Sequence, residues 1–92
     1  MWQLYILECN DSSLYVGVTS NLGRRFKDHL SGNGGRYTLH NRPDKILYTE
    51  AFNLRSDAEA RERQIKRWTR AKKIALVRGD FQSLTSLGAS RN

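Results

Sequence analysis

Five side chains between residues 5 and 62 have the chemistry to bind a phosphate, move a proton and hold a metal ion. They are Tyr5, Tyr15, Arg25, His29 and Glu62. Arginine presents a rigid fork of donors that fits phosphate oxygens, and glutamate is a hard oxygen ligand suited to Mg²⁺. Tyrosine, with an ordinary pKa of about 10, becomes a usable base only where its phenolate is stabilised. Histidine can assist a proton or bind a phosphate, although a lone histidine in a helix is commonly structural.

The two tyrosines lie in segments that are predicted to be neighbouring strands. Apolar side chains alternate with other residues over 2–8, which is typical of a half-buried strand, and residues 14–18 form a second such run. Residues 10–13 between them are Asn, Asp and Ser, which favour a turn. We therefore expect an antiparallel hairpin with one tyrosine on each strand.

A helix is predicted directly after the hairpin, and it carries the arginine and the histidine. Leu22, Phe26 and Leu30 recur every four residues and form one apolar stripe. Arg25 and His29 are also four apart, so they share a second stripe beside the first. The side chain that caps the start of this helix is expected to be one of three: Thr19, Ser20 or Asn21.

The candidate metal ligand lies in a second long helix. Residues 56–59 have the pattern of a capping box, so the helix is expected to begin there and to run to about residue 68 or 70. The glutamate that ends the box is explained by that capping role. Glu62 shares a narrow angular band with Ala58, Ile65 and Thr69, which places its carboxylate on the inward face. Burying an unpaired carboxylate is costly, so Glu62 needs either a nearby arginine or a metal ion.

The remaining elements complete a small mixed fold. Residues 45–52 are rich in β-formers and are predicted to be a third strand. A short third helix is expected to reach about Val77, with Gly79 ending it. The predicted fold class is α/β (α+β), a three-stranded antiparallel sheet flanked by helices. We expect one domain at residues 1–80, followed by a short C-terminal helix and tail at residues 81–92.

The chain is strongly basic, with 16 Lys and Arg against 9 Asp and Glu, a net charge of +7 and a pI near 10.1. This favours a polyanionic partner, most often nucleic acid, although an acidic protein partner or charge for solubility alone are alternatives. Residues 31–43 are predicted to form a long loop that combines cations with an aromatic ring; this suits a nucleic-acid strand but also an ordinary polar loop. The basic run beyond Trp68 either grips phosphates or is a solvated face, and Trp68 itself is expected in the core or as a lid. The candidate nucleic-acid contacts are Arg24, Lys27, Arg36, Tyr37, His40, Arg42, Lys66, Arg70, Lys72 and Lys73.

The single cysteine fits a reducing compartment, and the lengths of the apolar runs bear on targeting and membrane insertion. Cys9 is the one cysteine, so no internal disulfide can form and no Cys/His zinc cluster is expected. The sequence has no signal-peptide pattern and no apolar run long enough to span a membrane. We expect a cytoplasmic protein that is a monomer or a weak dimer.

In order and spacing, these residues resemble the GIY-YIG endonuclease family. The first motif would be Gln3-Leu4-Tyr5, which keeps only the tyrosine of the family pattern, and the second would be Tyr15-Val16-Gly17. Asn21-Leu22-Gly23-Arg24-Arg25 is similar to the segment that carries the family's catalytic arginine, and a later helix supplies Glu62. The resemblance covers roughly residues 2–75. The late asparagine with which the family often ends its site has no clear counterpart here.

The resemblance implies a metal-dependent DNA endonuclease that uses Mg²⁺, with Mn²⁺ able to substitute. In that reading Glu62 holds the metal and Arg25 binds the scissile phosphate. Tyr5 is favoured as the general base, with Tyr15 positioning the water or the phosphate, but the sequence does not separate the two. His29 assists the proton or binds a phosphate. Gly17 allows backbone or substrate to approach closely, or marks a bulge.

The biological role expected from the resemblance is DNA repair or processing. Whether the DNA is single-stranded, duplex or branched is left open by the sequence. The alternative function is a non-catalytic nucleic-acid-binding module on the same scaffold, and a third is an adaptor for an acidic protein.

Overall fold

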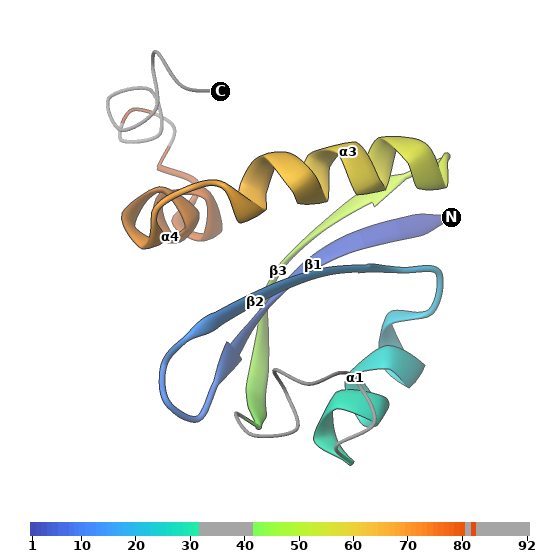
Figure 1. Ribbon diagram of the computed structural model, residues 1–92, viewed down its shortest axis with the longest axis horizontal. Helices are drawn as coiled ribbons and strands as arrows, with labels where there is room; N and C mark the ends of the chain where they lie inside the picture. The colour runs from blue at the N-terminus through green and yellow to red at the C-terminus, as the bar shows by residue number, and fades with distance from the viewer. Residues whose placement is uncertain (32–41, 81, 83–92) are drawn as a thin grey trace.

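The computed structural model describes residues 1–31, 42–80 and 82. In this part of the chain the order of elements is β1 (Trp2–Cys9), β2 (Leu14–Thr19), α1 (Leu22–Leu30), β3 (Pro43–Phe52), α3 (Arg55–Lys66) and α4 (Arg70–Arg78). The predicted α+β class is confirmed: a three-stranded antiparallel sheet is combined with three helices. In Figure 1, α3 and α4 lie above the sheet and α1 lies below it.

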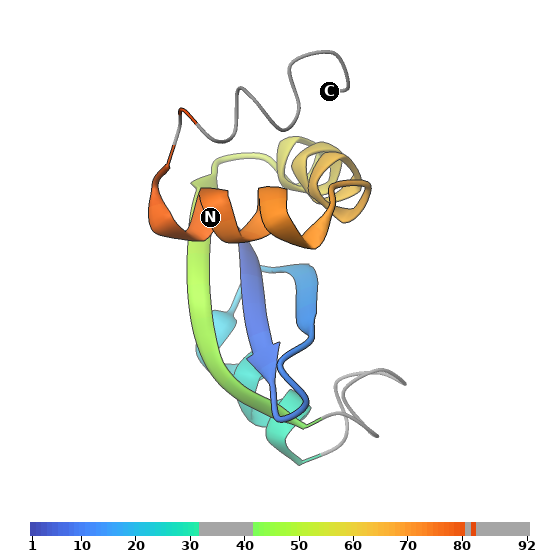
Figure 2. The ribbon, with the colours of Figure 1, turned by 90° about the vertical axis from the view of Figure 1, so that its left-hand side faces the viewer.

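The central strand of the sheet is β1, and the strand order is β2-β1-β3. Tyr5 of β1 pairs with Gly17 of β2 on one side and with Thr49 of β3 on the other. The expected hairpin between the first two strands is therefore present. The β1–β3 register shifts between Ile6 and Leu7 and again near the end of β1. The longer strand β3 bends beside β1, and Figure 2 shows its curvature.

The main core lies between the sheet and the two later helices. Because side chains alternate across a strand, Leu4 and Ile6 point to the face that α3 and α4 cover. They pack with a set of fully buried and partly buried side chains: Val16, Ile65, Leu76, Leu14, Val18, Tyr48, Phe52, Trp68 and Val77. Trp68 was expected in the core or as a lid, and its packing against this cluster confirms that prediction. The opposite face of β1 carries Tyr5, which is left to meet α1.

The start of α1 is set by Asn21, one of the three predicted caps. Its side-chain Oδ1 accepts a hydrogen bond from the backbone N–H of Arg24 at 3.1 Å. The predicted apolar stripe is wrong at its end, because Leu30 is 42% exposed. The residue of α1 that is fully buried is His29, from the second stripe. A polar contact described below draws this face of the helix toward the sheet.

The capping box predicted at residues 56–59 is not formed. The N-cap of α3 is Leu54, two residues before the serine at the start of the predicted box, so the helix begins at Arg55. Leu54 makes no side-chain capping bond. Glu59 pairs instead with Arg55, at 3.1 Å between Nε and Oε2. The helix also ends earlier than expected, at Lys66, and Thr69 caps the following helix α4 through its hydroxyl.

The predicted third helix is present as α4, and Gly79 ends it with a left-handed φ of 71°. Ala58 and Ile65, both fully buried, hold α3 on the sheet as their spacing predicts. Apart from residue 82, the tail predicted at 81–92 lies outside the described residues, so the boundary at residue 80 stays a prediction. Among the residues that the structure describes, no helix has the length and apolar character needed to cross a bilayer.

Candidate active site

The ring of Tyr5 occupies the space above Gly17, its partner on the neighbouring strand. A Cβ atom added at Gly17 would lie 2.4 Å from the Tyr5 hydroxyl oxygen and 2.5 Å from Cζ. Any side chain at this position would collide with the ring, so glycine is required for packing. The sequence predicted that Gly17 lets backbone or substrate approach closely, or that it marks a bulge. In the structure the group that approaches closely is the side chain of Tyr5.

Tyr5 and His29 form a buried polar pair. The Tyr5 hydroxyl lies 3.0 Å from His29 Nε2, and the two residues are 1% and 0% exposed. Burial lowers the pKa of His29, and the nearby charge of Arg25 lowers it further. The imidazole is therefore held in its neutral form near pH 7, with one nitrogen able to accept a proton.

Tyr15 completes an aromatic group of three rings. Its ring centroid lies 6.3 Å from that of Tyr5 and 5.0 Å from that of His29. Tyr15 is only half-buried, whereas Tyr5 is enclosed. The hairpin and α1 thus bring the two predicted tyrosines and the predicted histidine together.

Arg25 joins this group from one helical turn before His29. Its pKa is raised chiefly by hydrogen bonding to Tyr5, and the charge interaction with Tyr15 adds to the effect. The pKa of Tyr5 is raised above its ordinary value because burial outweighs the lowering influence of Arg25. Arg25 thus places beside both phenols a guanidinium group, whose fork of N–H donors fits an anion such as phosphate.

Glu62 approaches the same site from α3. The pKa of Tyr5 is raised chiefly by burial, and the negative charge of Glu62 adds a small further increase. The side chain is 23% exposed, at the edge of the buried stripe, and its ion pair is with Lys66 at 3.4 Å. The sequence left open an arginine as the partner of Glu62, but the ion pair that the structure shows is with a lysine.

A divalent ion could be held here by one carboxylate. Within the described parts of the chain, no three His, Cys, Asp or Glu side chains are grouped closely enough to form a metal cage. Mg²⁺ commonly keeps several waters and is bound through one or two carboxylates together with substrate phosphate oxygens. The exposed edge of Glu62 fits that kind of site.

The predicted nucleic-acid contacts do not all lie on the surface. Arg24 and Lys27 of α1, and Lys66 and Arg70 of the later helices, are exposed, while Lys73 is half-buried. Burial, and then the charge of Lys66, lowers the pKa of Lys73. Arg42 is exposed and donates to the backbone carbonyl of Leu30 at 2.9 Å. Three further candidates lie outside the described residues: Arg36, Tyr37 and His40.

Lys72 requires a correction. It is only 4% exposed, and its ammonium nitrogen lies 4.2 Å from the centre of the Trp68 ring. A cation over the face of an aromatic ring is attracted by the ring quadrupole. Lys72 therefore belongs to the packing of α4 and does not present its charge to a phosphate.

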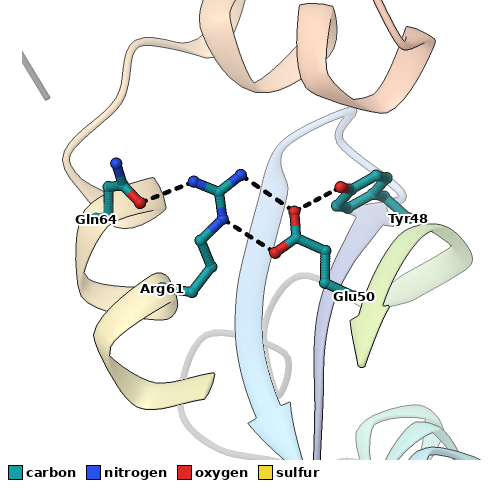
Figure 3. Close-up of polar contacts among 4 residues, drawn as sticks. All are labelled: Tyr48, Glu50, Arg61 and Gln64. Carbon is teal, nitrogen blue, oxygen red and sulfur yellow. Dashed lines mark hydrogen bonds and ion pairs between the residues drawn. The ribbon is translucent and has the colours of Figure 1, made fainter. Parts of the chain in front are cut away.

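The sequence interpretation missed a polar network that joins β3 to α3 (Figure 3). Arg61 donates through Nε to Glu50 Oε1 at 3.0 Å and through a terminal nitrogen to Oε2 at 3.1 Å. Its other terminal nitrogen donates to Gln64 at 2.7 Å, and Tyr48 donates to Glu50. Burial alone would raise the pKa of Glu50, but the bonds from Arg61 and Tyr48 lower it overall. No local pattern signals this pairing, because the two charged residues lie in different elements.

Comparison with known proteins agrees with this fold. Residues 1–75 match the family described as the GIY-YIG catalytic domain, and the chain belongs to that family. Proteins of this family typically use a divalent metal ion, and a nuclease activity is implied.

The similar proteins are small UPF0213 proteins of bacteria and archaea, a designation that specifies no activity. UPF0213 protein HQ_3675A of Haloquadratum walsbyi is 44% identical over 80% of this chain and 83% of its own length. UPF0213 protein CPE1444 of Clostridium perfringens is 45% identical over 80% of each. The solution NMR structure of UPF0213 protein BH0048 from Bacillus halodurans has 41% identity and a TM-score of 0.54, covering 84% of this chain and 83% of that one.

Proposed function

We propose that this protein is a divalent-metal-dependent endonuclease that hydrolyses phosphodiester bonds in DNA. The observation that carries the proposal is the Tyr5–His29 pair, joined by Arg25 on one side and approached by Glu62 from a separate helix. The net charge of +7 supports a polyanionic substrate. Family membership supports nuclease chemistry rather than binding alone.

The proposed roles follow from what each group can do at its position. Arg25 binds the scissile phosphate and stabilises the charge that grows on it. Tyr5 takes a proton from the attacking water as its own hydroxyl proton passes to Nε2 of His29, 3.0 Å away. In this arrangement His29 carries its other proton on Nδ1. The raised pKa of Tyr5 is then no obstacle, because a free phenolate never has to accumulate.

Tyr15 is proposed to orient the water or the phosphate, since its ring adjoins both Tyr5 and His29 and is less enclosed. Glu62 is proposed to hold Mg²⁺ or Mn²⁺. When bound, that ion supplies Lewis-acid stabilisation of the phosphate and the leaving oxygen. With a single carboxylate in the described site, metal affinity is expected to be weak until DNA phosphate oxygens complete the coordination shell.

The test is a cleavage assay with labelled single-stranded, duplex and branched DNA, in Mg²⁺ and in EDTA. Glu62→Gln and Arg25→Ala should abolish cutting while leaving folding and most DNA binding intact. Glu59→Gln is the matched control, since it removes a partly exposed carboxylate from the same helix, one whose ion pair is with Arg55, and it should cut normally.

Metal-dependent cutting by the wild type that is lost in Glu62→Gln would support the proposal. Intact DNA binding without cutting of any DNA form would instead favour a non-catalytic binding module. Loss of folding in Glu62→Gln would assign this glutamate a structural role.

A further inference from the structure

The pairing of Arg61 with Glu50 is a two-pronged ion pair between α3 and the sheet. Both carboxylate oxygens of Glu50 are engaged, by two different nitrogens of one guanidinium. The pair is largely enclosed, with the Arg61 and Glu50 side chains 26% and 20% exposed. A bidentate pair of this kind fixes the relative orientation of the two side chains as well as their separation, because a planar guanidinium must align with a planar carboxylate.

Arg61 and Glu62 lie on opposite flanks of the buried stripe of α3. Consecutive residues of an α-helix are about 100° apart, so with Ala58 and Ile65 facing the sheet, Arg61 falls to one side and Glu62 to the other. Arg61 reaches across to β3 on its side (Figure 3). Glu62 falls on the flank away from β3, which is the side of β2, a strand that α3 also contacts. The charge of Glu62 also adds a small contribution to the raised pKa of Tyr5.

The apolar contacts of α3 do not fix its rotation by themselves. Ala58 and Ile65 are fully buried, but burial of apolar surface is non-directional. Side chains reach about 5 Å from a helix axis, so a rotation of about 10° would move a carboxylate by about 1 Å. A displacement of about 1 Å in an active site can lower a rate by about 100-fold.

The strand that anchors Arg61 is also the strand that flanks Tyr5. Glu50 and Tyr48, both in the network, lie on either side of Thr49, and Thr49 is the β3 residue paired with Tyr5. The anchor and the phenol thus share one stretch of sheet. The guanidinium of Arg61 also lies 5.2 Å from the centre of the Trp68 ring, which supports it from the side of α4.

We propose that Arg61, held by Glu50, is a positioning residue that sets the rotation of α3 and so places the Glu62 carboxylate opposite Tyr5 and Arg25. This inference rests on the proposed function for its catalytic consequence. It assigns to Arg61 and Glu50 an effect on metal use that a merely stabilising ion pair would not have.

The test compares Arg61→Gln and Glu50→Gln with wild type, and uses Arg55→Gln as a matched control. Arg55 also pairs with a glutamate of α3, at 3.1 Å, and that ion pair lies within the helix. Its contact with the sheet is a guanidinium over the Trp2 ring, 5.0 Å from the ring centre, and not an ion pair with a strand carboxylate. DNA binding in EDTA, the rate at saturating DNA and the Mg²⁺ concentration for half-maximal rate are measured at a temperature where every variant is folded.

For Arg61→Gln and Glu50→Gln we expect a rate 10- to 100-fold lower and a half-maximal Mg²⁺ concentration at least tenfold higher, with DNA binding in EDTA within about twofold of wild type. Arg61→Lys, which keeps the charge but not the fork, should recover only part of the loss. Arg55→Gln should match wild type. Unchanged rate and metal dependence in Arg61→Gln would overturn the proposal, as would a loss in Arg55→Gln of the same size.

A second measurement does not depend on cutting. Mn²⁺ held by Glu62 should broaden the NMR signals of the His29 ring in the wild type, and Arg61→Gln should weaken that broadening at equal Mn²⁺ concentration. Equal broadening in both proteins would overturn the positioning role. If Arg61→Gln shows weaker broadening than wild type, but the wild type cuts no DNA, the result would contradict the proposed function while leaving the positioning role supported.

Discussion

Tyr5 and Gly17 are cross-strand partners, and the missing side chain of Gly17 is the space that the Tyr5 ring fills. The enclosed position of Tyr5 and its approach to His29 both depend on that space. Gly17 of the second motif thus affects the site by making room for Tyr5 of the first motif.

Gly17→Ala should destabilise the fold and displace Tyr5. The added Cβ would lie 2.4 Å from the phenol oxygen, so the ring must move, and overpacking of this kind typically costs about 1–3 kcal/mol. Urea unfolding measures the change. The matched control is Gly23→Ala in α1, where the new Cβ would lie 3.9 Å from Oδ1 of the N-cap Asn21, an ordinary contact, and a gain of up to about 1 kcal/mol is expected. A loss of stability in Gly23→Ala as large as that in Gly17→Ala would contradict the packing argument.

Removing the hydroxyl of one tyrosine at a time should distinguish the catalytic roles of Tyr5 and Tyr15. Tyr5→Phe loses the group that contacts His29 Nε2 and should reduce cleavage by about 100-fold or more, the typical contribution of a positioned proton-transfer group. Tyr15→Phe keeps the aromatic contacts and should reduce the rate less. Single-turnover rates at saturating DNA are the measurement. The reverse order of effects would assign the base to Tyr15.

The acid side of the stability profile should depend on His29. Its pKa in the folded protein is lowered, mainly by burial, so the unfolded chain binds the proton more readily. The stability from neutral His29 is therefore fully present above about pH 6.5 and is lost as the pH falls from there toward the lowered value. Urea midpoints at about pH 7.5 and about pH 5.5 measure the fall. In His29→Phe the fall over this interval should be smaller; an unchanged fall would argue against the buried neutral imidazole.

Neighbouring lysines of α4 should behave differently. Lys73→Met should weaken DNA binding and reduce the slope of log K against log salt by about 0.7–0.9, since about one phosphate contact is lost. Lys72→Met should leave that slope unchanged and lower the free energy of unfolding by about 1–2 kcal/mol, because the contact with Trp68 is removed. Salt titrations of DNA binding and thermal unfolding of both variants provide the comparison. A reduced salt slope in Lys72→Met would contradict the buried placement.

Much of the first part of the fold was predictable because its signals are local. The alternation over β1, the turn residues after it and the cap at Asn21 act within a few positions of one another. The convergence of Tyr5, Tyr15 and the residues of α1 follows from that local geometry. The start of α3 was not predictable in this way. Arg55 lies over the Trp2 ring at 5.0 Å, a contact between distant segments that the capping pattern cannot anticipate.

The polar network and the buried lysine were missed for a related reason. Helical and strand patterns repeat every 3.6 or 2 residues, whereas Glu50 and Arg61 belong to different elements and meet only when α3 packs on the sheet. A run of basic residues indicates a charged surface, but it cannot indicate which member lies over a tryptophan. Lys72 was therefore grouped with its exposed neighbours.

The order of the residues along the chain has a consequence for biosynthesis. Tyr5, Arg25 and His29 are made in the first third of the chain, whereas Glu62 lies on α3, which follows β3 in the chain. A nascent chain on the ribosome that has emerged only through α1 carries the arginine and the phenols without the carboxylate. Under the proposed function this nascent chain is inactive because its metal ligand has not been made. The growing polypeptide therefore cannot cleave nucleic acid before its translation has passed Glu62.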